Sequence, residues 1–201
     1  MPDEQFSAPI RLELPFALER TTVNAYLFLE PEPILVDTGD LADATWQALE
    51  VGLAQHGLAV GDLRKVIISH THIDHFGQAA RLAETSDAHF YVIDAGFNWL
   101  TRFTEHWQMR YDYYRTVFLP ATGMPAGEQQ KVLFFSNRVL DIYRGVPATR
   151  VTALHPGEHL ELGPYIWEVL HLPGHASTQT CFYQPATRQL LASDMLLRRT
   201  P

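Results

Sequence analysis

Alternating apolar and polar positions shape the first part of the chain. β-Branched and aromatic residues alternate over 10–17 and 22–29, which predicts two strands, and the apolar run 34–36 predicts a third. We expect these three strands to form a β-meander. Apolar residues at helical spacing then predict a helix over 43–56, because Gly57 stands where a helix C-terminal glycine belongs.

The next segment combines strands with a helix. The run 65–69 is short and almost wholly apolar, as in strands that are covered on both faces, and it ends at His70. A helix is expected from about His75 to Thr85, and a strand over 88–93. This order of strand, helix and strand predicts an α/β layout with helices packed on sheets.

A long interruption follows at about 95–145. Its helical stretches are crowded with aromatic residues, and we interpret it as a helical insertion whose aromatic side chains form mainly its own core. Strands are predicted again over 151–154, 159–162 and 165–170, so the second half is expected to rebuild a sheet. No repeat or linker divides the sequence, which indicates a single domain over 1–201.

Composition limits the partners of the chain. Its 15 basic and 23 acidic residues give a formal net charge of -8, which disfavours binding to nucleic acid or to anionic membranes. The sequence has no secretory signal and no apolar run of membrane length, so we expect a cytoplasmic protein that acts on a small molecule, with a homodimer left open. Its single cysteine, Cys181, lies in a predicted strand, where a buried thiol is the ordinary occupant.

Three imidazoles and one carboxylate lie within the six residues 70–75, directly after the buried strand. In an extended loop, residues two apart project the same way, so His70 and His72 can bind one ion. Asp74 and His75, at the start of a helix, then turn toward another ion. Imidazole and carboxylate ligands without a thiolate suit zinc, iron or manganese. The cluster therefore predicts a site for two metal ions.

Two later segments supply further candidate ligands. Pro173-Gly174 turns the chain after a predicted strand, so that His175 can face a pocket. The apolar strand over 189–193 changes polarity at Asp194, at a strand end where loops carry sites in α/β folds. His175 is the expected third imidazole, and Asp194 could bridge both ions.

These motifs occur in a familiar order. The order His70-x-His72-x-Asp74-His75, then Pro173-Gly174-His175, then Ser193-Asp194, preceded by Val36-Asp37-Thr38-Gly39, resembles the metallo-β-lactamase superfamily along nearly the whole chain. The resemblance implies an αββα sandwich with the metals in a groove at one sheet edge. It also implies that one ion takes His70, His72 and His175, and the other Asp74 and His75, with Asp194 bridging. The branch that the chain resembles most is the group of hydroxyacylglutathione hydrolase-like (glyoxalase II-like) proteins with a helical insertion.

The end of the sequence departs from that pattern. In the family, the second ion takes one more histidine from a loop after the bridging aspartate, whereas this sequence ends at Pro201, seven residues after Asp194. We therefore expect the chain to lack the C-terminal elements of the fold. Asp37 is interpreted as a structural turn residue that could also fix a ligand imidazole.

The ligand set predicts a metal-dependent hydrolase that cleaves an ester, a thioester or a lactone by a metal-bound hydroxide. Two divalent ions are expected, zinc first, with iron or manganese as alternatives, and no residue is assigned to an organic cofactor. Asp74 is the expected catalytic residue, because it could orient the attacking hydroxide as well as bind metal. The alternative hypotheses are a mononuclear iron sulfur dioxygenase of the same fold and an inactive metal-binding fragment.

Overall fold

The strands of the protein form two sheets, of which the first has six strands. The computed structural model describes residues 8–16 and 21–197. The strand order of the first sheet is β1-β2-β3-β4-β5-β6. These strands are β1 (Ile10–Phe16), β2 (Thr21–Phe28), β3 (Ile34–Val36), β4 (Lys65–Ile68), β5 (His89–Ile93) and β6 (Val151–Leu154). The first three pair antiparallel, as the predicted meander requires, and β3 to β6 pair parallel.

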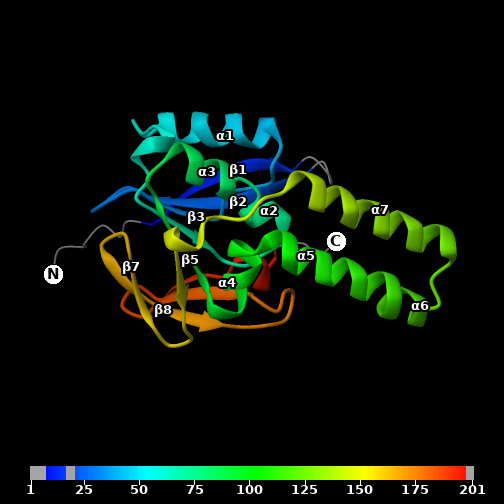
Figure 1. The fold of residues 1–201 in the computed structure, drawn as a ribbon. Coiled ribbons are helices and arrows are strands. Elements are labelled where there is room, and N and C mark those ends of the chain that lie inside the picture. Colours follow the sequence, from blue (N-terminus) through cyan, green and yellow to red (C-terminus); the bar gives the residue numbers. More distant parts are fainter. Residues whose placement is uncertain (1–7, 17–20, 198–201) are drawn as a thin grey trace.

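The second sheet has four antiparallel strands in the order β10-β9-β8-β7. They are β7 (His159–Leu162), β8 (Tyr165–His171), β9 (Thr180–Gln184) and β10 (Gln189–Leu191). Cys181 is buried in β9, which confirms its interpretation as a strand thiol. Figure 1 shows this sheet below the first one, with β7 and β8 at its near side.

Along the chain, helices alternate with the last strands of the first sheet, and the longest helical stretch separates β5 from β6. The α-helices are α1 (Asp43–Ala54), α2 (Ile73–Phe76), α3 (Ala79–Thr85), α4 (Asp94–Thr101), α5 (Phe103–Tyr113), α6 (Leu119–Ala121) and α7 (Ala126–Ile142). The other helical segments are the 3-10 helices η1 (Val60–Asp62), η3 (Ala148–Arg150) and η4 (Ser193–Met195) and the π-helix η2 (Tyr114–Phe118). Both α1 and α3 cover one face of the first sheet (Figure 1).

The core has two parts, one on each face of the first sheet. Val66 and Ile68 of β4 face the helices and pack in the same cluster as Leu49 of α1. Ile67 faces the other way and packs in a cluster with Trp167 of β8. Burying one such aliphatic side chain stabilises the fold by about 1.5–3 kcal/mol. The apolar run of β4 is thus explained by burial on both faces, as predicted.

The layers confirm the predicted α/β sandwich. In the described residues they run helix, sheet, sheet, with the two sheets packed face to face. On the outer face of the second sheet, Ile166 and Leu190 are 54% and 42% exposed. Their alternation with the buried Trp167 and Leu191 shows which face of this sheet looks inward.

The helix expected over 75–85 is in fact two helices. The first, α2, already begins at Ile73, and the chain leaves the helical conformation at Gln78 before α3 begins. A Cβ atom at Gly77 would lie 2.6 Å from the carbonyl carbon of Asp40, so this residue packs directly against backbone. Gln78 Nε2 also donates to the carbonyl oxygen of Asp40 at 2.7 Å. These long-range contacts break the helix, and sequence spacing does not reveal them.

The second half does build a sheet, as predicted, but its first strand, β6, joins the first sheet instead. β6 pairs parallel with β5, and the second sheet begins only at β7. Parallel neighbours need a long crossover between them, and here the helical stretch after β5 provides it.

The crossover forms an arm of helices. α5 and α7 run side by side away from the sheets (Figure 1). Phe103 and Trp107 stack with ring centroids 5.5 Å apart, and Trp107 Nε1 donates to the carbonyl oxygen of Ser136 in α7 at 2.8 Å. Phe103 and Trp107 are nevertheless buried in the same apolar cluster as Leu49 of α1, so they extend the core of the first sheet and do not form the separate core that the sequence predicted. α7 spans 17 residues, yet no helix in the described ranges is both long and apolar enough to cross a membrane.

Candidate metal centre

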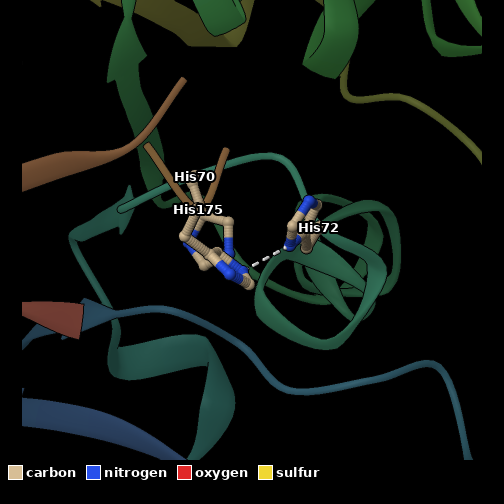
Figure 2. Close-up of side chains that lie close together, drawn as sticks. All are labelled: His70, His72 and His175. Carbon is tan, nitrogen blue, oxygen red and sulfur yellow. Dashed lines mark hydrogen bonds between the residues drawn. The ribbon is translucent and has the colours of Figure 1, made fainter. Parts of the chain in front are cut away.

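Three of the four predicted histidine ligands lie on loops that meet where the two sheets come together, and the fourth, His75, lies in α2. His70 and His72 follow β4, and His175 lies between β8 and β9. Figure 2 shows the three imidazole rings gathered in one place. A backbone hydrogen bond from the N–H of Thr180 to the carbonyl oxygen of Ser69, at 2.9 Å, ties the start of β9 to the end of β4. This bond fixes one loop against the other.

His70, His72 and His175 form a first cluster, in which the ligand atoms lie within 4.8 Å of one another. Nε2 of His175 is 2.9 Å from Nδ1 of His72. The ring centroid of His70 is 4.7 Å from that of His72 and 5.2 Å from that of His175. Nitrogens bound to one tetrahedral zinc, each at about 2.1 Å, lie roughly 3.4 Å apart. The three rings therefore need only small adjustments to hold one ion.

A second cluster consists of His70, His75 and Asp194, whose ligand atoms also lie within 4.8 Å of one another. Oδ1 of Asp194 is 3.5 Å from Nε2 of His75, and Oδ2 is 3.4 Å from Nε2 of His175. Asp194 thus faces both clusters, as a bridging ligand would. His70 belongs to both clusters, which the spacing of the motif did not predict.

Asp74 lies beside the second cluster and belongs to neither group. Its Oδ2 is 3.7 Å from Nε2 of His75, in the first turn of α2. Burial holds the pKa of Asp74 above its ordinary value, although the nearby His75 partly opposes this. The assignment of Asp74 and His75 to one ion stays a prediction.

Two imidazole nitrogens of the site lack a hydrogen-bond partner among the described residues. They are Nε2 of His70 and Nε2 of His75, and both are buried. Leaving a buried polar atom unsatisfied costs about 1–3 kcal/mol. Both atoms belong to the candidate clusters, so a bound cation would satisfy them. A donor set of imidazoles and carboxylates fits zinc, iron or manganese.

Burial and mutual repulsion favour the neutral form of two of the histidines. Burial first, and then the neighbouring imidazoles, hold the pKa of His70 far below its ordinary value. Burial and His175 likewise lower the pKa of His72 to about 4. A neutral imidazole presents the lone pair that binds a metal ion. Both side chains are therefore in the ligating form at neutral pH.

The carboxylates around His75 raise its pKa, in contrast to the lowered pKa values of His70 and His72. Burial would lower the pKa of His75, but the negative charges of Asp37, Asp194 and Asp74 outweigh it and raise the pKa to about 10. Burial would raise the pKa of Asp194, yet its contact with His75 holds that pKa below the ordinary value. Three carboxylates therefore concentrate negative charge here, which favours a cation.

Asp37 holds two segments of the centre in place. It is buried directly after β3, with φ of 62°. Its Oδ1 accepts from the backbone N–H of Ser69 at 2.8 Å, and its Oδ2 accepts from Ser69 Oγ at 2.7 Å. Oδ2 also lies 2.9 Å from Nδ1 of His75, so Nδ1 carries the proton and Nε2 is left to face the cluster. Both roles considered for Asp37 from the sequence, turn residue and imidazole partner, are present.

Two serines complete this network; from the sequence, Ser193 was named only within the Ser193-Asp194 motif, and neither serine was assigned a role. Ser69 Oγ is 3.1 Å from Nδ1 of His70 and 2.8 Å from Oγ of Ser193. Ser193 has φ of 44°, a conformation uncommon outside glycine, which turns the chain just before Asp194. The signal available in the sequence was that each serine immediately precedes a candidate ligand.

A pocket of about 270 Å³ adjoins the first cluster. His72 and His175 line it together with Trp99 of α4 and Arg110 of α5. The sequence favoured a packing role for the aromatic residues of the insertion, and Phe103 follows that expectation because it is buried. Trp99 is an exception, since part of its surface faces the pocket.

The comparison with known protein families decides what kind of chain carries this centre. The family model described as the metallo-beta-lactamase superfamily matches residues 18–201. The chain belongs to the metallo-beta-lactamase superfamily. The ligand motifs that suggested this superfamily therefore lie in a genuine member of it.

This superfamily member resembles two curated proteins. It is 27% identical over 193 residues to the probable metallo-hydrolase YqjP of Bacillus subtilis (strain 168), an alignment that covers 94% of the chain and 56% of the relative. It is 26% identical over 170 residues to an uncharacterized protein of Aquifex aeolicus (strain VF5), covering 83% of the chain and 61% of that relative. The chain thus spans less than two thirds of the length of either relative.

Solved structures show the metallo-beta-lactamase fold. The metallo-beta-lactamase family protein TTHA1429 from Thermus thermophilus superposes with a TM-score of 0.69 at 27% identity, over 96% of the chain and 60% of that structure. MEM-A1, a subclass B3 metallo-beta-lactamase from a soil metagenome library, gives a TM-score of 0.58 at 19% identity, over 89% of the chain and 55% of that structure. The second likeness concerns the fold alone.

Proposed function

We propose that the protein is a metal-dependent hydrolase that cleaves a small-molecule ester, thioester or lactone with two divalent ions, zinc being the expected metal. The observation that carries this proposal is the convergence of imidazoles and a carboxylate around Nε2 of His70 and Nε2 of His75, two buried nitrogens without a hydrogen bond among the described residues. Similarity to a probable metallo-hydrolase supports it. The motif order and the helical insertion favour the hydroxyacylglutathione hydrolase-like (glyoxalase II-like) branch.

Six residues would hold the ions. His70, His72 and His175 would take one, Asp74 and His75 the other, and Asp194 would lie between them. Bound divalent ions lower the pKa of a water molecule toward neutrality and polarise a carbonyl oxygen.

Asp74 is the residue proposed to orient the attacking water. Its side chain is 20% exposed, whereas the adjacent His75 is only 4% exposed, so Asp74 is the group that a water molecule can reach. Its carboxylate can accept a hydrogen bond from that water and take up a proton during attack. No nucleophilic side chain is needed in this scheme.

The test combines metal analysis with a substrate panel. We expect about two zinc ions per chain by inductively coupled plasma mass spectrometry, and hydrolysis of at least one ester, thioester or lactone that stops when a chelator removes the metal. Asp74→Asn should lower kcat about 100-fold or more, since general acid–base groups contribute on the order of 10²–10⁴. Asp87→Asn, an exposed control, should leave kcat unchanged. Failure to bind metal would overturn the proposal.

One observation favours a second candidate, a mononuclear iron sulfur dioxygenase. The cluster of His70, His75 and Asp194 has two histidines and one carboxylate, a set that suits non-haem Fe(II) oxygenases. This candidate predicts a single iron per chain and oxygen consumption with a persulfide substrate. One iron with oxygen uptake and no hydrolysis would replace the hydrolase proposal, and two zinc ions without oxygen uptake would exclude the dioxygenase.

A further inference from the structure

Arg110 reaches the pocket beside the first histidine cluster from the helical arm. It lies on α5 and lines the pocket with Trp99, while His72 and His175 line it from the side of the sheets. Burial is the main cause of the lowered pKa of His72, and the positive charge of Arg110 adds to it. The guanidinium is therefore near the place where a substrate would meet the ions.

Two aromatic rings fix the position of this guanidinium. Its central carbon lies 4.8 Å from the ring centroid of Trp107 and 5.0 Å from that of Tyr114. Nη2 of Arg110 also donates to the hydroxyl oxygen of Tyr114 at 3.1 Å. A side chain held in this way loses little conformational entropy when it binds a ligand.

The charge of Arg110 lacks a carboxylate partner among the described residues. Three exposed arginines of the arm do have one, in the pairs Arg102–Glu105, Arg115–Asp112 and Arg138–Asp141. Arg110 is half-buried, and its side-chain hydrogen bond to Tyr114 uses one of five N–H donors. Partial burial of an unpaired charge is unfavourable, and an anionic ligand would offset it.

We propose that Arg110 binds a carboxylate group on the acyl part of the substrate, so that the protein prefers acyl groups that end in a carboxylate. This inference rests on the proposed hydrolase function. A guanidinium presents two parallel N–H donors that match the two oxygens of a carboxylate, and one cation balances one negative charge. The pocket of about 270 Å³ leaves room for a short acyl chain between Arg110 and the histidines, with Trp99 as its apolar wall.

A binding experiment tests this without turnover. Glutarate is titrated by calorimetry into the zinc-loaded protein and into the metal-free protein. Arg110→Met should weaken glutarate binding about 10- to 100-fold, because a hydrogen bond between charged groups is lost. Arg115→Met removes a matched arginine of the same arm outside the pocket and should bind like the unchanged chain. No glutarate binding, equal binding by Arg110→Met, or tighter Arg110-dependent binding of inorganic phosphate would overturn the inference.

A second variant distinguishes the loss of the Arg110 charge from a change in the packing of the arm. Tyr114→Phe removes the hydroxyl that Arg110 contacts but keeps the ring and the charge. It should retain glutarate affinity within about twofold, since the donor fork remains intact. If Tyr114→Phe lost binding as fully as Arg110→Met, the effect would come from the packing of the arm and the inference would fail.

Kinetics then distinguish this inference from the proposed function. With 4-nitrophenyl hydrogen glutarate, Arg110→Met should raise KM about 10- to 100-fold, and with the neutral 4-nitrophenyl butyrate it should leave KM unchanged. Hydrolysis of both esters with no dependence on Arg110 would overturn the inference and leave the hydrolase standing. Arg110-dependent glutarate binding without hydrolysis of any ester would overturn the hydrolase and leave the carboxylate site standing.

Discussion

Single side chains set the geometry of the metal centre, and Asp37 connects two segments of it. Its carboxylate joins the backbone and hydroxyl of Ser69 to Nδ1 of His75. Asp37 therefore determines which nitrogen of His75 faces the cluster. Partners of this kind fix the tautomer and the orientation of a ligating imidazole.

Asp37→Asn should weaken metal binding while leaving the chain folded. Asparagine tolerates the positive φ of this position, whereas its amide cannot accept from both Ser69 and His75 as the carboxylate does. We expect a loss of metal affinity of about 10- to 100-fold, measured by competition with a chromogenic chelator. Asp43→Asn removes an exposed carboxylate that pairs with Arg81 and should have no effect. Equal affinity in both variants would contradict this account of Asp37.

His72→Ala should remove the ion of the first cluster. It takes away one of three imidazoles whose ligand atoms lie within 4.8 Å of one another. The metal content after dialysis should fall by about one ion per chain, measured by inductively coupled plasma mass spectrometry. His171→Ala is the matched control, because His171 Nε2 bonds the carbonyl oxygen of Ser177 and lies outside both clusters. Unchanged metal content in His72→Ala would contradict the ligand assignment.

The six ligand candidates could be named from the sequence because they follow strand ends in short motifs. What the sequence could not show is that His70 belongs to both clusters, since this depends on how the loops meet in space. For Asp37 the sequence left two roles open. Its contact with His75 could not be foreseen, because it depends on the pairing of β3 with β4. Arg110 was missed because the direction of α5 relative to the pocket has no signature in spacing.

Among the elements, the break between α2 and α3 matters most for the centre. Residues 77–78 pack against the backbone of Asp40, and this contact fixes the short helix that carries Asp74 and His75. Strand boundaries were predicted well because alternation and apolar runs reflect burial, whereas this break arises from contact with a residue far away in sequence.

Gly77→Ala should destabilise the protein and disturb the centre. The added Cβ would lie 2.5 Å from the carbonyl oxygen of Ile73 and 2.6 Å from the carbonyl carbon of Asp40, so backbone must move. Overpacking of this kind costs about 1–3 kcal/mol in the free energy of unfolding, which urea denaturation measures. Gly127→Ala meets open space in α7 and should not destabilise. Equal stability of the two variants would show that the backbone yields easily.

At the level of the whole molecule, the candidate ligands come from both sheets. His70 follows β4 of the first sheet, whereas His175 and Asp194 follow β8 and β10 of the second. An ion bound by these three side chains would connect the sheets at one edge, in addition to the apolar contacts between them. Metal binding and the stability of the whole fold are therefore expected to be coupled.

Removal of metal should lower the melting temperature. A ligand that binds the folded state at 100 times its Kd stabilises by about 2.7 kcal/mol, which corresponds to roughly 5–11 °C for a chain of this size. Differential scanning calorimetry of the zinc-loaded and chelator-treated protein measures this difference. His72→Ala should show a smaller difference than the unchanged chain. Identical melting temperatures with and without zinc would argue against an ion that links the sheets.

The crossover between β5 and β6 has a consequence for how such a protein diversifies. The helical arm leaves the sheet after Ile93 and returns by Val151, at two strands that are direct neighbours. Every candidate metal ligand lies outside that stretch, whereas Trp99 and Arg110 lie inside it. Replacement of the arm as a unit would therefore leave every candidate metal ligand in place, while it would change the residues that line the pocket from that side.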